Sequence, residues 1–149
     1  MGRPKKDAHA IPTPARILTA AEAAFGRLGY EACRLEDIAA VAGIRRPSLL
    51  YHFESKEVLY AAVVREGYNS LIESLSPSMS EEASIEDAIM GMVDAFLAFL
   101  ETRPSFAPIV VRELIAPEGP GAHIIREELG NVQISCLYLP KVFTKKVYA

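Results

Sequence analysis

Two short apolar segments joined by a glycine constrain the fold of this chain more than any other feature. Apolar and small residues recur at helical spacing before Gly43, at Leu35, Ile38, Ala39 and Ala42. Pro47 begins a second segment, whose apolar positions are Leu49, Leu50 and Phe53. Gly43 suits the turn because glycine adopts a left-handed backbone without a Cβ penalty. Two short helices joined in this way predict a helix-turn-helix.

Longer helices are predicted on both sides of this motif. Upstream, Thr13 as N-cap and Pro14 as the first helical residue begin a helix that ends at Gly29. Downstream, Ser55 caps a helix that runs to Ser76. The apolar residues expected to form the core of this lobe are Phe25, Leu28, Leu35, Ile38, Leu49 and Phe53. The pattern predicts an all-α fold with an N-terminal DNA-binding domain over residues 13–60.

Composition fits one globular unit with an uneven charge. Half of the 149 residues are apolar and 23% are charged, so the chain can bury a core and about one domain is expected. The net charge of −3 combines a local +2 over residues 1–60 with a local −5 over residues 61–149. The N-terminal part is therefore basic relative to an acidic remainder.

Several protein classes are excluded. The charged start lacks the apolar segment of a secretory signal, and the apolar stretch 88–100 is shorter than the roughly 20 residues of a membrane span. Cys33 and Cys136 lie far apart without metal-ligand spacing, so neither a disulfide framework, a metal site nor a cofactor is expected. The three histidines are isolated, and no glycine-rich phosphate loop is present. We expect a cytoplasmic protein that is not an enzyme.

The motif residues resemble a known family. The sequence from Gly29 to Ala39, then Ala42-Gly43-Ile44, Ser48–Phe53 and Ser55-Lys56-Glu57, closely resembles the TetR family of bacterial transcriptional regulators. The likeness covers about residues 13–66. It implies an all-helical homodimeric repressor, in which the helix-turn-helix binds a palindromic operator and a larger helical C-terminal domain binds a small-molecule inducer.

Three positions depart from the family pattern. Cys33 stands where the family usually has a Thr or Ser cap, and Arg45 stands where a serine usually opens the recognition helix. Leu50 replaces a common aromatic residue. A missing cap weakens a helix by about 1 kcal/mol. The operator preferences of the family are therefore not transferred to this chain.

Candidate DNA contacts cluster around the second short helix, because the N-terminal part of a recognition helix faces the base edges of the major groove. They are Arg34, Arg45, Arg46, Pro47, Ser48, Tyr51, His52 and Lys56. The resemblance implies that Tyr51, His52 and Lys56 contact phosphates, and a helix N-terminus such as that at Lys56 favours a phosphate.

Structural alternatives stand beside these assignments. Arg45 and Arg46 would be solvated loop charges if the segment did not meet DNA. Arg34 would serve equally well in an ion pair with Glu36 or Glu31.

The N-terminal segment 1–12 is predicted to be a flexible basic arm. Its cations Arg3, Lys5 and Lys6 resemble the short arms that enter an A·T-rich minor groove. A disordered solubilising tail is the alternative.

Residues 61–130 are expected to form an incomplete helical domain for ligand binding and dimerisation. Ser84 and Asp87 form a capping box that opens a helix ending at Arg103-Pro104. Its shared apolar face comprises Ile85, Ile89, Val93, Phe96 and Leu100. Further helices are predicted over about 105–116 and 122–129. The candidate residues for an apolar effector pocket, with core packing as the alternative role, are Met90, Met92, Phe96, Phe99, Phe106 and His123.

Residues 131–149 have a different pattern of apolar and charged residues. Apolar residues alternate with period two from Val132 to Tyr138, and Lys141, Lys145 and Lys146 make the end basic. We expect this tail to be atypical, with the natural sequence cut or shifted near Gly130. Two functions follow: a ligand-responsive homodimeric repressor, or a dimerisation-defective module that binds DNA weakly or sequesters a partner.

Overall fold

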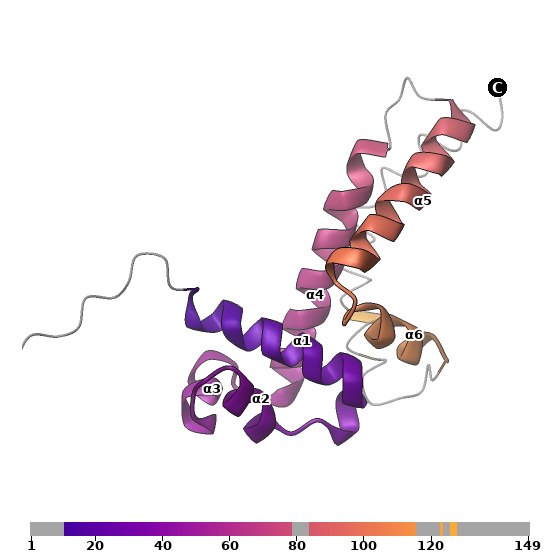
Figure 1. The fold of residues 1–149 in the computed structure, drawn as a ribbon. Helices are drawn as coiled ribbons and strands as arrows, with labels where there is room; N and C mark the ends of the chain where they lie inside the picture. The colour runs from indigo at the N-terminus through magenta and orange to yellow at the C-terminus, as the bar shows by residue number, and fades with distance from the viewer. Residues whose placement is uncertain (1–10, 79–83, 116–122, 124–125, 128–149) are drawn as a thin grey trace, which may run out of the picture.

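Helices make up every regular element that the structure defines (Figure 1). The structure, a computed structural model, describes residues 11–78, 84–115, 123, 126 and 127. Within these residues the six α-helices are α1 (Thr13–Ala32), α2 (Leu35–Val41), α3 (Arg46–His52), α4 (Lys56–Leu75), α5 (Ile85–Thr102) and α6 (Ala107–Ile115), with a short 3-10 helix η1 (Ser76–Ser78). The predicted all-α fold is confirmed.

The first helix begins differently from the prediction. Thr13 is the first helical residue and Pro12 is the N-cap, because the Pro12 carbonyl accepts the first helical bond from the Arg16 amide at 3.1 Å. No side chain caps this end, so the predicted Thr13 cap is wrong. Gly29 interrupts the helix with φ 80°, which agrees with the predicted stop, and a further turn continues to Ala32.

The helix-turn-helix is formed as predicted. Gly43 has φ 67°, and the Ile44 amide donates to the Ala39 carbonyl at 2.9 Å. The Gly43 amide donates to the Ala40 carbonyl at 3.1 Å, which completes a Schellman motif at the end of α2. Glycine is required here because a side chain in the left-handed region costs about 1 kcal/mol or more.

Neither short helix has a side-chain cap. Arg45 is the N-cap of α3 and makes no capping bond, as expected for its departure from serine. At α2 the N-cap is Arg34, one residue after the expected position, because the Arg34 carbonyl accepts the first helical bond, from the Ile38 amide. Cys33 is instead buried in the core.

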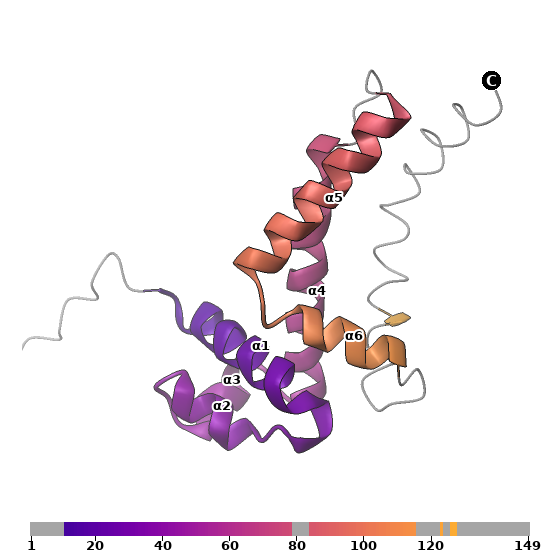
Figure 2. The same cartoon turned by 45° about the vertical axis from the view of Figure 1, so that its right-hand side comes forward.

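The fourth helix connects the N-terminal lobe to the rest of the molecule. Ser55 accepts a hydrogen bond from the Val58 amide at 3.1 Å, which confirms the predicted cap. In Figures 1 and 2 α4 runs without interruption from the helix-turn-helix to the far end of α5, which packs along it. The helix therefore passes through the domain boundary predicted at residue 60.

The helices that follow agree with the prediction except at one boundary. Ser84 accepts a hydrogen bond from the Asp87 amide at 3.1 Å, so Ser84 is the N-cap of α5 as predicted, and its hydroxyl donates to the Asp87 carboxylate at 2.6 Å. α6 begins at Ala107 rather than at about Ser105, because residues 104–106 form a turn in which the Phe106 amide donates to the Arg103 carbonyl. The predicted helix over 122–129 lies largely outside the described residues, and so do the basic tail and the arm residues Arg3, Lys5 and Lys6.

The core lies between α1, α4 and the two short helices. Phe25, Ile38 and Leu49 are fully buried as predicted, while Leu35 and Phe53 are partly buried against them. Leu28 is 40% exposed, which corrects its assignment to the core. After the positive φ at Gly29, the chain turns so that Tyr30 rather than Leu28 stacks on Phe25, with 6.2 Å between the ring centroids.

No helix of the described residues combines the length and the hydrophobicity needed to cross a bilayer.

Candidate nucleic-acid interface

The recognition helix α3 presents one apolar face and one polar face. Leu49 is fully buried, whereas the predicted contact residues of this segment are all exposed: Arg45, Arg46, Pro47, Ser48, Tyr51 and His52. Tyr51 is 85% exposed, and its ring meets the His52 ring edge-on at 5.3 Å. An exposed tyrosine next to a histidine at a helix end offers two polar groups to a ligand outside the protein.

An acidic residue of α2 lies against this face. The Arg46 Nε is 2.9 Å from the Glu36 Oε1, and both side chains are more than half exposed. Glu36 therefore pairs with Arg46 and not with Arg34, which was one of the alternatives. The pair leaves the terminal Nη groups of Arg46 available for bidentate bonds to guanine. Sequence reasoning missed this contact because Glu36 and Arg46 belong to different helices.

Arg34 is exposed at the start of α2. Among the described residues, no ion pair joins it to either of the carboxylates considered for it, Glu36 and Glu31. The side chain therefore stays a candidate for DNA contact.

Lys56 is held by the protein more firmly than the sequence indicates. Its Nζ donates to the carbonyls of Glu31 at 3.1 Å and Cys33 at 3.0 Å, and lies 4.6 Å from the centroid of the Tyr30 ring. These contacts tie the start of α4 to the connection between α1 and α2. An ammonium group has three donors, so one remains for a phosphate. No local pattern shows this, because the acceptors lie more than 20 residues away.

Cys33 is a structural residue of the same connection. Its side chain is 2% exposed, and burial raises the pKa of the thiol. The nearby Lys56 charge lowers that pKa by a smaller amount, and Asp37 adds to the increase. A thiol kept neutral in this way packs as a small apolar group.

Arg16 supports the turn of the helix-turn-helix. Its Nη2 donates to the Ala42 carbonyl at 2.8 Å across 26 residues of sequence. This bond satisfies a carbonyl at the end of α2 and fixes the turn against α1. Sequence reasoning missed Arg16, since only the tertiary fold brings it to the turn.

The six candidate effector residues fall into different environments. Phe99 and Phe106 are buried in edge-to-face contact at 5.9 Å, so they have the core role given as the alternative. Met90 and Phe96 are exposed, by 61% and 43%, whereas Met92 is half-buried. His123 is exposed.

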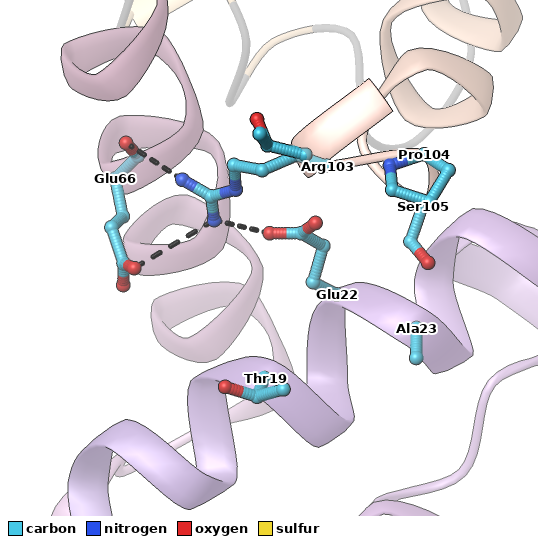
Figure 3. A pocket seen from close by; sticks show the side chains of 8 residues that line it. Thr19, Glu22, Ala23, Glu66, Arg103, Pro104 and Ser105 are labelled. Atoms are coloured by element: carbon cyan, nitrogen blue, oxygen red, sulfur yellow. Dashed lines mark hydrogen bonds and ion pairs between the residues drawn. The ribbon is translucent and has the colours of Figure 1, made fainter. Parts of the chain in front are cut away.

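A polar pocket lies elsewhere, where α1, α4 and the end of α5 meet (Figure 3). Its volume is about 450 Å³, and it is lined by Thr19, Glu22, Ala23, Glu66, Thr102, Arg103, Pro104 and Ser105. The Arg103 guanidinium points between Glu22 of α1 and Glu66 of α4 and contacts both carboxylates. None of the predicted effector residues lines this pocket.

Comparison with known proteins places the N-terminal lobe in a family. The family model described as bacterial regulatory proteins, tetR family, matches residues 17–63, which cover most of α1 and all of α2 and α3. The chain is 33% identical over 113 residues to the HTH-type transcriptional regulator RutR of Escherichia coli (strain K12). That match covers 76% of this chain and 51% of RutR.

Other relatives include both an activator and a negative regulator of transcription. The transcriptional activator FasR of Mycolicibacterium smegmatis is 31% identical over 86 residues, which cover 58% of this chain and 39% of FasR. The negative transcriptional regulator IcaR of Staphylococcus epidermidis is 28% identical over 109 residues, which cover 73% of this chain and 57% of IcaR. The chain thus spans about half the length of these curated relatives.

The fold also has counterparts among solved structures. The fatty acid degradation regulator FadR from Bacillus halodurans superimposes with a TM-score of 0.71 at 20% identity. The superposition covers 91% of this chain and 68% of FadR, so the shared architecture extends beyond the helix-turn-helix. With its helix-turn-helix, its match over residues 17–63 and its related sequences, the N-terminal lobe of this chain belongs to the TetR family of bacterial regulatory proteins.

Proposed function

We propose that this chain is a DNA-binding transcriptional regulator, most concretely a repressor that binds a palindromic operator as a homodimer and responds to a small molecule. The observation that carries the proposal is the exposed polar face of α3, held in place by the capped turn at Gly43 and by Arg16. TetR-family regulators are generally not enzymes. The site of action that fits this role is chromosomal DNA in the bacterial cytoplasm.

The contact face suits the major groove. The N-terminal residues of α3 would face base edges, with Arg46 able to bind a guanine through its Nη groups. Tyr51 and His52, at the other end of the helix, would bind phosphates and fix the register. Lys56, with one remaining donor, would add a phosphate contact. Arg34, at the start of α2, would add another. The arm residues Arg3, Lys5 and Lys6 would extend binding to the minor groove.

Repression follows from dimer geometry. Two recognition helices would read half-sites whose centres lie roughly 34–36 Å apart, so a dimer would bind two successive turns of the duplex. A small molecule that favours another separation of the two helices would release the operator. The effector would bind in the C-terminal helices. There Met90, Met92 and Phe96 of α5 and His123 stay candidates, whereas Phe99 and Phe106 contribute to the core.

The test is a gel-shift titration on the DNA upstream of the coding region, with excess competitor, at two salt concentrations. We expect a competitor-resistant complex containing two chains per site. Arg46→Ala should weaken specific binding by about 1–3 kcal/mol, whereas Lys56→Ala should reduce the salt slope by about one unit. Arg27→Ala is a matched control, because it removes the same charge from an exposed position on α1. Equal binding by all four proteins would refute the proposed docking.

A second candidate function rests on the exposed apolar face of α5. Ile89, Val93 and Phe96 are 43–47% exposed on this helix. A module of this kind would remain monomeric, bind DNA weakly and use the face to sequester a partner. Light scattering separates the two candidates, since the repressor requires a dimer at micromolar concentration.

A further inference from the structure

We propose that Arg103 and Arg112 are positioning residues, which clamp the DNA-binding lobe at a fixed angle to α4 and α5 and thereby set the half-site spacing that a dimer can bind. The fixed angle of the lobe concerns this chain alone. The half-site spacing rests on the proposed function.

Arg103 joins three helices at the end of α5. Its guanidinium contacts the Glu22 carboxylate of α1, and it donates to the Ser70 Oγ of α4 at 2.9 Å (Figure 3 shows the carboxylate contacts). The Glu66 carbonyl lies at 3.3 Å, and the Glu66 carboxylate at 3.7 Å. The side chains of Arg103 and Glu22 are only 20% and 11% exposed. A largely buried ion pair favours one arrangement of its helices because other arrangements leave a charge without its partner.

Arg112 acts on α1 about one turn beyond Glu22. Its guanidinium donates to the carbonyls of Phe25 at 3.0 Å, Gly26 at 2.7 Å and Arg27 at 3.0 Å. These are three of the last four carbonyls before the break at Gly29, where the backbone leaves the helical path. The last carbonyls of a helix need donor partners from outside it. A side chain of α6 therefore caps α1 from a distance of 85–87 residues in the sequence.

The chain between the two arginines is seated closely on both helices. A Cβ on Gly26 would lie 2.2 Å from the Ser105 carbonyl oxygen, and a Cβ on Gly67 would lie 2.0 Å from the Phe106 ring. Only glycine permits such close approach of α1 and α4 to this segment. Phe106 is buried there, edge-on to Tyr68 at 5.5 Å. We define residues 103–112 as the clamp.

The clamp controls the orientation of the recognition helix through packing. It grips α1 at Glu22 and at residues 25–27, α1 packs on α2, and α2 packs on α3. None of the clamp residues belongs to the predicted DNA-contact set. Loosening the clamp should therefore leave a single half-site contact intact, while it broadens the range of separations that two lobes sample.

The direct test measures the lobe orientation in the full chain without DNA. Spin labels are placed at Ser48→Cys on α3 and Leu97→Cys on α5, both exposed, in a Cys136→Ser background; Cys33 is buried. We expect a narrow distance distribution for the parent protein and a distinctly broader one for Arg112→Met. Arg112→Lys, which retains donors, should restore most of the narrow distribution. Arg27→Met is the control for loss of charge.

Removing Arg103 alone would leave the buried Glu22 carboxylate without its partner and could unfold the protein. The double variant Glu22→Gln with Arg103→Met therefore removes both charges together. It should broaden the distribution as Arg112→Met does. Unchanged distributions in both variants would overturn the clamp, whatever the DNA experiments show.

The DNA readout uses palindromes whose half-site spacing changes one base pair at a time, with a single half-site as reference. The parent should show a sharp optimum. The clamp variants should lose about tenfold at that optimum and retain their half-site affinity. Equal loss on half-site and palindrome would indicate a merely structural role and overturn the positioning role. A parent that binds no palindrome specifically, with broadened distances in the variants, would overturn the proposed function and leave the clamp standing.

Discussion

The N-terminal lobe and α5 differ in how their apolar residues are used. In the lobe, Ile17, Phe25, Ile38 and Leu49 are all completely buried. In α5 only Phe99 is buried among the described residues, and six large apolar side chains are 39–61% exposed: Ile85, Ile89, Met90, Val93, Phe96 and Leu97. The short helices α2 and α3 have seven residues each and depend on packing against a core, whereas the 18 residues of α5, with a serine cap, can form a helix that has one face exposed. Helical periodicity thus predicts a helix without saying what covers it.

The largest expected effect compares one core residue with one open-face residue. Phe25→Ala should lower the free energy of unfolding by about 3–5 kcal/mol, because it empties a fully buried site between α1 and α4. Leu97→Ala should change it by about 0.5 kcal/mol or less, because Leu97 is 53% exposed. Urea unfolding followed by circular dichroism measures both. Equal losses would mean that α5 is covered in solution.

A second variant disturbs the contact between α4 and the turn that follows α5. Gly67→Ala should destabilise the protein by about 1–3 kcal/mol, since the added Cβ collides with the Phe106 ring. The same urea titration applies. Adding Phe106→Leu makes room for the methyl group and should recover part of the loss. No recovery in the double variant would show that the collision is not the cause.

The helix caps provide a smaller, matched comparison. Ser55→Ala should cost about 1 kcal/mol in global unfolding, because Ser55 caps the helix that all the lobe packs against. Ser84→Ala removes an equivalent cap, but at the exposed start of α5, so it should act mainly on local opening. Hydrogen exchange of the first turns of α4 and α5 separates the two effects. A global loss from Ser84→Ala as large as that from Ser55→Ala would contradict the difference between the regions.

The smallest expected effect is a decrease in the free energy of unfolding at alkaline pH, caused by groups in the lobe. Burial raises the pKa of Cys33 above its usual 9.0, so the folded state holds the thiol proton more tightly than the unfolded state. The stability from this group is complete below about pH 9 and is lost as the pH rises through the folded pKa. Burial raises the pKa of Tyr30 as well, in the same sense but from 10.0.

The free energy of unfolding should therefore decrease from about pH 8 to about pH 10. The decrease should be less steep for Cys33→Ala than for the parent protein. Identical slopes for the two proteins would remove Cys33 from this explanation.

Local sequence signals predicted the helices of the lobe well. Gly29, Gly43 and Ser55 each mark a helix end or start because the requirement is local: a positive φ or a nearby side-chain oxygen. The Thr13 cap failed because Pro12 takes the capping position, with its carbonyl accepting the first helical bond. The prediction that Leu28 is a core residue was wrong because the chain turns after it.

The exposed polar face of α3 was predictable in outline, but the contacts that support it were not. An amphipathic α3 with its cations at the start follows from the sequence alone. The bonds of Arg16, Lys56 and Arg112 join residues 23–87 positions apart, and no local pattern selects their carbonyl partners. The predicted effector residues Phe99 and Phe106 look the same in sequence whether they line a cavity or fill a core. The structure places both in the hydrophobic core, Phe106 against Gly67 and Phe99 against Phe106.

The unbroken α4 has a mechanical consequence. A helix of 20 residues is about 30 Å long, so tilting it by about 5° about one end moves the other end by about 2.5 Å. Hydrogen bonds to DNA tolerate only a few tenths of an ångström. A slight change in packing around Leu75 would therefore displace Lys56 and α3 by more than a hydrogen bond from the proposed contact residues could tolerate.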